Sequence, residues 1–87
     1  MSKLNSAKEI LRSDLVDAPH VHDNLWGNAT TMRKIENYVI ESVKAGVGAG
    51  DCTDWFNDLL NEFEIEDKGY SSTLSFMFNI LNRYINS

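Results

Sequence analysis

Hydrophobic residues recur at intervals of three and four along most of the chain, which is the spacing of amphipathic α-helices. No segment shows the sustained alternation of apolar and polar residues that is typical of a half-buried strand. We therefore expect an all-α fold, a small bundle of three to four helices. Because a chain of 87 residues can enclose one hydrophobic core and not two, we expect residues 1–87 to form a single helical domain.

The first helix is predicted to start near Ser6 and to end by Val16. Ser6 and Glu9 have the spacing of a capping box, in which each side chain binds the backbone N–H of the other residue, and Pro19 stops a helix. The apolar face of this helix is thin, because Asp14 falls in the same sector as the leucines.

The connection 17–28 combines one proline and one glycine with aspartates and asparagines, which favours a loop. We expect Leu25 and Trp26 to pin it to the core. His20 and His22 lie in this connection, and two imidazoles with nearby carboxylates are the raw material of a metal site. No second group of ligands with a recognised spacing follows. We therefore expect solvated histidines, and the sequence leaves open whether they bind a metal.

A second helix is predicted from Asn28 or Thr30 to Gly46, where a glycine suits the left-handed conformation of a C-terminal cap. Its apolar face is formed by Met32, Ile35, Val39 and Val43. Glu36 falls inside this face, and a carboxylate there needs a partner. We expect it to reach water or to pair with a cation such as Arg12; the alternative is a buried acid that serves a site.

The third helix is predicted from Asp51 or Thr53 to Phe63 or Glu64. Its apolar stripe consists of Trp55, Phe56, Leu59, Leu60 and Phe63, and its opposite side carries Asp54, Asp58 and Glu62. Like charges four residues apart weaken a helix by a few tenths of a kcal/mol per pair, so packing of the apolar stripe must stabilise this segment.

The last helix is predicted from Ser71 or Ser72 to about Ile85. Its large apolar residues are Leu74, Phe76, Met77, Phe78, Ile80, Leu81, Tyr84 and Ile85. They cover roughly 200° of the circumference, which is wider than the apolar stripe of a surface helix. We therefore expect this helix either to lie at the centre of the bundle or to share its surface with another chain.

The formal net charge of −5 originates in the second half of the chain. Residues 1–50 contain six basic and six acidic side chains, whereas residues 51–87 contain only Lys68 and Arg83 against seven carboxylates. The seven carboxylates are Asp51, Asp54, Asp58, Glu62, Glu64, Glu66 and Asp67. Such a concentration produces one anionic surface and exceeds what solubility requires.

Two interpretations of this acidic region remain. In the first, the seven carboxylates bind a basic surface of a partner protein, and the protein regulates or inhibits that partner. The extreme form is a DNA mimic that blocks a nucleic-acid-binding enzyme, and the small size and nine asparagines suggest an inhibitor encoded by a virus or mobile element. In the second, the acidic face only confers solubility, and the last helix forms a homo-oligomer or enters a partner's groove. We favour the first.

Other activities are disfavoured. The single Cys52 lies beside acidic residues that oppose a reactive thiolate, and the glycines of segment 45–51 follow a predicted helix, unlike those of phosphate-binding loops. We expect no enzyme and no cofactor, because no nucleophile, base and orienting residue share a recognisable spacing. We also expect no direct contact with nucleic acid, no membrane span and a cytoplasmic location.

Overall fold

The computed structural model describes residues 2–17 and 24–85, and four α-helices account for most of them. They are α1 (Lys3–Asp17), α2 (Ala29–Lys44), α3 (Ala49–Glu62) and α4 (Tyr70–Ile85). No strand occurs within these two ranges. The expected all-α bundle of three to four helices is therefore confirmed.

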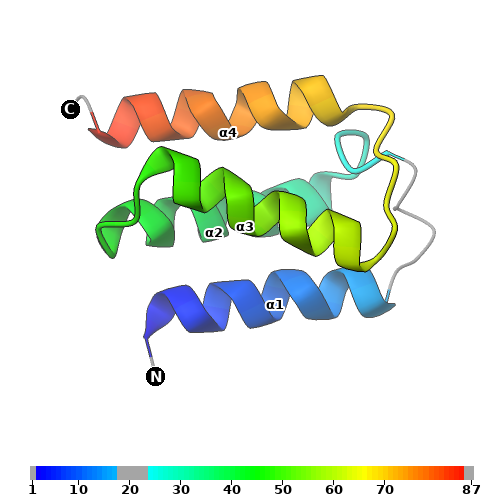
Figure 1. Cartoon of the computed structure of the whole chain (residues 1–87), viewed down its shortest axis with the longest axis horizontal. Coiled ribbons are helices and arrows are strands. Elements are labelled where there is room, and N and C mark those ends of the chain that lie inside the picture. The colour runs from blue at the N-terminus through cyan, green and yellow to red at the C-terminus, as the bar shows by residue number, and fades with distance from the viewer. Residues whose placement is uncertain (1, 18–23, 86–87) are drawn as a thin grey trace.

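Helix α2 lies at the centre of the bundle. Successive helices run in opposite directions, with α1 below and α4 above α2, and α3 crosses in front of α2 (Figure 1). Helix α2 packs against α1, α3 and α4, whereas α4 packs mainly against α2 and more sparsely against α3. Of the two alternatives for the last helix, the central position is thus wrong, because α2 separates α4 from α1.

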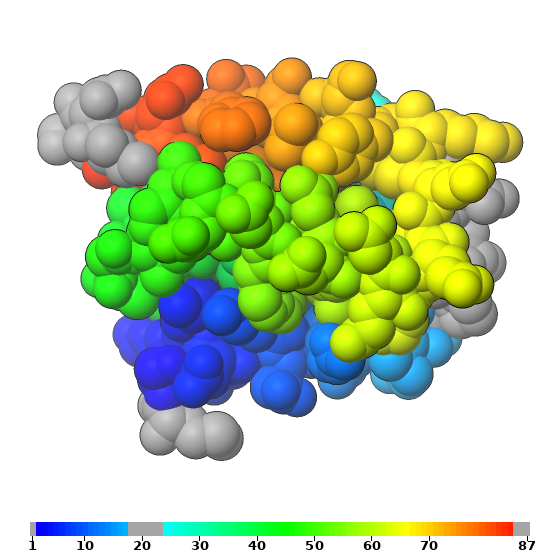
Figure 2. All heavy atoms as spheres, viewed as in Figure 1, coloured from blue at the N-terminus to red at the C-terminus, as the bar shows by residue number. Residues whose placement is uncertain are grey.

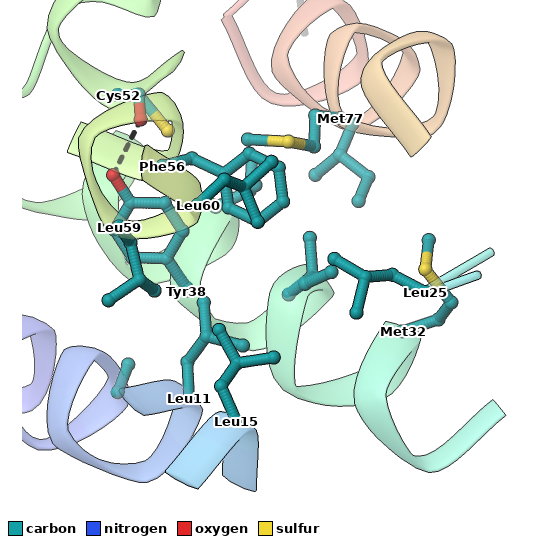
Figure 3. Packing of buried hydrophobic residues seen from close by; sticks show 14 of the residues in the cluster. Leu11, Leu15, Leu25, Met32, Tyr38, Cys52, Phe56, Leu59, Leu60 and Met77 are labelled. Carbon is teal, nitrogen blue, oxygen red and sulfur yellow. Dashed lines mark hydrogen bonds between the residues drawn. The ribbon is translucent and has the colours of Figure 1, made fainter. Parts of the chain in front are cut away.

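The core is a continuous cluster of side chains from all four helices and from the 24–28 connection. Leu11 and Leu15 of α1 approach the aromatic ring of Tyr38, and Phe56 and Met77 close the cluster on the other side (Figure 3). Tyr38 buries its hydroxyl group here, and this group donates a hydrogen bond of 2.7 Å to the carbonyl oxygen of Cys52. Burial of this phenol raises its pKa above the ordinary value of tyrosine.

Two of the predicted helix starts differ from the structure because other groups bind the free N–H groups. Helix α1 begins earlier than Ser6, since the side-chain oxygen of Ser2 accepts the Asn5 N–H at 3.1 Å. Helix α4 begins at Tyr70, before the two serines expected as its cap, and the N–H of Tyr70 binds the backbone oxygen of Asp67 at 3.1 Å.

Helix α3 also starts earlier than predicted. Gly48 precedes it in an extended conformation, and Asp51 lies in the first turn rather than at the cap. The hydroxyl group of Thr53 donates to the carbonyl oxygens of Ala49 and Gly50, one turn back along the helix, and therefore does not cap the helix.

The predicted C-terminal cap of α2 is confirmed. Gly46 has a φ of +81°, and Val47 N–H binds the carbonyl oxygen of Ser42, the hydrogen bond of a Schellman motif. Helix α3 ends in the same motif, but there the left-handed position is occupied by Glu64, with a φ of 54°. Glycine adopts this conformation at little cost, whereas a glutamate is strained in it.

A hydrogen-bonded cluster that we call the Asp67 junction ties the 24–28 connection to the start of α4; it comprises Leu25, Trp26, Asp67, Gly69 and Thr73. One carboxylate oxygen of Asp67 accepts the N–H groups of Leu25 and Gly69 at 3.1 and 3.0 Å, and the other accepts the Thr73 hydroxyl at 3.1 Å. Leu25 is completely buried, and the half-exposed Trp26 meets Phe76 edge-on. Both predicted anchors of the connection thus contact the bundle.

Asp14, the acidic residue on the apolar face of α1, binds two side chains of α2. Asp14 accepts hydrogen bonds from Thr31 and Lys34, and the Lys34 nitrogen lies 2.6 Å from its oxygen. The suggested pairing of Glu36 with Arg12 is wrong, because Arg12 forms its ion pair with Glu62 of α3.

Candidate functional site

Four carboxylates follow one another along the outer side of α3, and we call this set, Asp51, Asp54, Asp58 and Glu62, the acidic stripe. All four are exposed, and spacings of three and four residues place them on one face of a helix. Helix α3 crosses the middle of one side of the molecule, between α1 and α4 (Figure 2). The acidic stripe therefore lies on an open surface.

The opposite side of α3 explains why the stripe points outward. Cys52, Phe56, Leu59 and Leu60 are all buried in the core, so the rotation of α3 about its axis is fixed by packing. A helix with this pattern cannot bury its carboxylates without exposing these four side chains.

The members of the stripe differ in their partners. Among the residues that the structure describes, Asp51, Asp54 and Asp58 form no ion pair, whereas Glu62 binds the guanidinium group of Arg12 in α1. The hydrogen bond from Arg12 to Glu62 raises the pKa of Arg12, and desolvation opposes this rise. The stripe thus has a free end near the start of α3 and a paired end near its C-terminus.

The three remaining predicted site residues follow α3 and take different positions. Glu64 and Glu66 are exposed, and the left-handed backbone of Glu64 forms the C-terminal cap of α3. Asp67 is half-buried, and both of its carboxylate oxygens accept hydrogen bonds within the Asp67 junction. The structure therefore brings four of the seven residues into one stripe, places two beside its end, and gives Asp67 a role in the fold.

A groove between α1 and α3 borders the stripe, and we call it the Trp55 groove. One part has a volume of about 90 Å³ and is lined by Arg12, Trp55, Asp58, Leu59 and Glu62. The adjoining part has a volume of about 550 Å³ and is lined by Asn5, Lys8, Glu9, Arg12 and Trp55. Sequence reasoning missed this groove, because it assigned Trp55 to the apolar stripe and could not tell that α1 lies beside it.

The ring of Trp55 contacts two groups of the same chain. The ring of Tyr38 packs against it with the centroids 4.8 Å apart, and the ammonium group of Lys8 lies 5.1 Å from its centroid. Arg12 lies in a similar way over Phe63, at 5.7 Å. The aromatic residues at the edge of α3 therefore already bind cations of α1.

Apolar surface is also exposed on α4, where Phe78 and Tyr84 are 40% and 42% accessible. Tyr84 follows Phe78 by six positions, which places the two side chains about 120° apart around the helix. They therefore do not form one apolar stripe.

The residues described contain no site for the other activities considered from the sequence, which were metal binding, thiol chemistry and phosphate binding. His20 and His22 lie outside the described residues, and no group of three or more potential ligands in 2–17 and 24–85 could hold a metal ion. Cys52 is buried. Gly46 serves as the helix cap, and no described helix has the length and apolar character needed to cross a membrane.

No family model, curated protein or solved structure matches this chain. The geometry of the acidic stripe and of the Trp55 groove is therefore the basis for a functional proposal.

Proposed function

We propose that the protein is a non-enzymatic binding protein that docks its acidic stripe on a basic surface of a partner protein and thereby regulates or inhibits that partner. The observation that supports this proposal is the row Asp51, Asp54 and Asp58, which is exposed and carries no ion pair among the described residues. Rows of uncompensated charge speed the capture of an oppositely charged partner and set its orientation.

The test compares the wild type with two variants of equal net charge. Asp54→Asn with Asp58→Asn removes two charges from the stripe, and the control Asp17→Lys makes the same change of charge at an exposed site on α1. Each protein is used for affinity capture from an extract of its host at low and at high salt, with circular dichroism as a check on folding.

We expect the wild type and Asp17→Lys to retain the same partner at low salt and the double variant to lose it. Retention should fall as salt rises, because salt screens interactions between exposed charges. Equal capture by all three proteins at every salt concentration would contradict the proposal.

A second candidate is self-association through α4, and the exposure of Phe78 and Tyr84 is the observation in its favour. Sedimentation of the wild type and of Phe78→Ser distinguishes it. A dimer that dissociates in the variant supports this candidate, and a monomer at all concentrations removes it.

A further inference from the structure

The Trp55 groove lies beside the acidic stripe and shares residues with it. Asp58 and Glu62 belong to the stripe and also line the smaller part of the groove. Trp55 and Arg12 line both parts, so the two parts meet at the indole ring. A partner that covers the stripe therefore also covers the mouth of the groove.

Three properties of the groove suit a cation. The half-buried indole of Trp55 offers a face on which the ammonium group of Lys8 already lies, 5.1 Å from the centroid. Asp58, at the groove wall, is exposed and has no ion pair among the described residues. Glu9 of α1 lines the larger part of the groove and adds a carboxylate to those of Asp58 and Glu62.

An arginine fits this combination better than a lysine does. The planar guanidinium group stacks on an aromatic face and can donate two parallel hydrogen bonds to one carboxylate, whereas an ammonium group is a compact and strongly hydrated point charge. Lys8 makes only a cation–π contact with the ring, so an arginine that stacks on the ring and also pairs with Asp58 can displace it.

We propose that an arginine side chain of the partner enters the Trp55 groove, stacks on Trp55 in place of Lys8 and pairs with Asp58. This inference rests on the proposed function of the acidic stripe and adds to it the chemical class of the residue that the partner presents. No covalent step is involved.

The test uses two fluorescently labelled peptides, tetra-arginine and tetra-lysine, which carry the same number of basic side chains. Their affinities are measured by anisotropy at low salt. In the variant Trp26→Phe, Trp55 is the sole tryptophan, and its emission reports whether a peptide reaches the groove.

We expect tetra-arginine to bind about fivefold more tightly than tetra-lysine and to change the emission of Trp55, as the added strength of stacking and bidentate pairing implies. Asp58→Asn should remove most of this preference for arginine. The matched control Asp54→Asn, one turn away and outside the groove lining, should weaken both peptides alike and leave the preference unchanged.

A variant that strengthens binding gives an independent readout that a loss of folding cannot imitate. Lys8→Ala removes the cation that occupies the ring, so the preference for tetra-arginine should rise about twofold or more. Lys3→Ala makes the same change of charge on the same helix and should strengthen both peptides equally.

The outcomes separate the two proposals. If both peptides bind equally well and neither Asp58→Asn nor Lys8→Ala alters their ratio, the groove inference is overturned while the acidic stripe still binds basic partners. If neither peptide binds at low salt, the groove inference and the docking role of the stripe both fail.

Discussion

The Asp67 junction and the acidic stripe use the same functional group for opposite purposes. In the junction, one carboxylate accepts three hydrogen bonds and joins segments that are 42 residues apart in sequence. In the stripe, the carboxylates of Asp51, Asp54 and Asp58 point outward and contribute no ion pair within the described residues. A carboxylate that accepts hydrogen bonds inside the fold stabilises it, whereas exposed carboxylates without an ion pair add little to stability.

The largest effect is expected from Asp67→Ala. This change leaves the N–H of the buried Leu25 without its partner and removes two further hydrogen bonds, which should lower the free energy of unfolding by about 3 kcal/mol. Urea unfolding of the wild type and the variant measures this difference in free energy. The neighbouring exposed carboxylate is the control, and Glu66→Ala should change stability by less than about 0.5 kcal/mol. Equal effects of the two changes would remove the distinction between junction and surface.

Gly69→Ala should break the junction by a different route. A Cβ atom at residue 69 would lie 2.7 Å from the Cβ of Trp26, which is fixed to the backbone, so the connection must shift. We expect a loss of about 2 kcal/mol, as for other overpacked sites. Gly50→Ala is the control, because a Cβ atom there meets nothing within 4 Å and the site is helical. It should instead raise stability by about 1 kcal/mol.

The left-handed residues that end α2 and α3, Gly46 and Glu64, offer a paired test of backbone strain. Glu64→Gly relieves a left-handed glutamate and should raise the free energy of unfolding by about 1 kcal/mol, and Gly46→Ala should lower it by about the same amount. Thermal melting shows whether the two variants change stability in these opposite directions. If Glu64→Gly instead lowers the melting temperature, the side chain of Glu64 stabilises the fold by more than its left-handed backbone destabilises it.

The buried hydroxyl group of Tyr38 in α2 predicts a response to alkaline pH. Because burial raises the pKa of Tyr38 in the folded state, the unfolded chain loses this proton first as pH rises above about 10, the ordinary value of tyrosine. Stability is therefore fully present below that pH and declines above it. Tyr38→Phe should lower stability by about 1 kcal/mol at neutral pH and make the alkaline decline shallower, as measured by urea unfolding across pH.

The smallest effect is expected from the stripe itself. Asp54→Asn relieves repulsion with Asp58 one turn away and should raise stability by a few tenths of a kcal/mol at low salt and by nothing at high salt. Loss of stability in this variant would mean that the stripe supports the fold, and the contrast with the Asp67 junction would then disappear.

The sequence was sufficient to predict the helices and their buried faces, because these depend on residues three and four apart. The apolar side of α3, the cap at Gly46 and the anchor Leu25 all belong to patterns within one segment. The helix starts were less accurate, since several serines and glycines compete as caps and the choice depends on which free N–H groups remain.

Contacts between distant segments could not be predicted. Arg12 pairs with Glu62 instead of Glu36, and Asp67 turns into the fold instead of outward, because each choice depends on how α1 and the 24–28 connection lie against α3 and α4. The pattern of the last helix was likewise ambiguous. An apolar width of this kind indicates many neighbours but does not say which helix is central, and in this bundle it is α2.

The alternation of direction among four helices has a practical consequence for attachment of the molecule to a surface or a fusion partner. The start of α1 and the end of α4 lie at the same end of the bundle, and α3 also starts there (Figure 1). A tether at either position therefore leaves Glu62 and the turn beyond it at the far tip. A large ligand can approach that tip from the bulk solution without meeting the support.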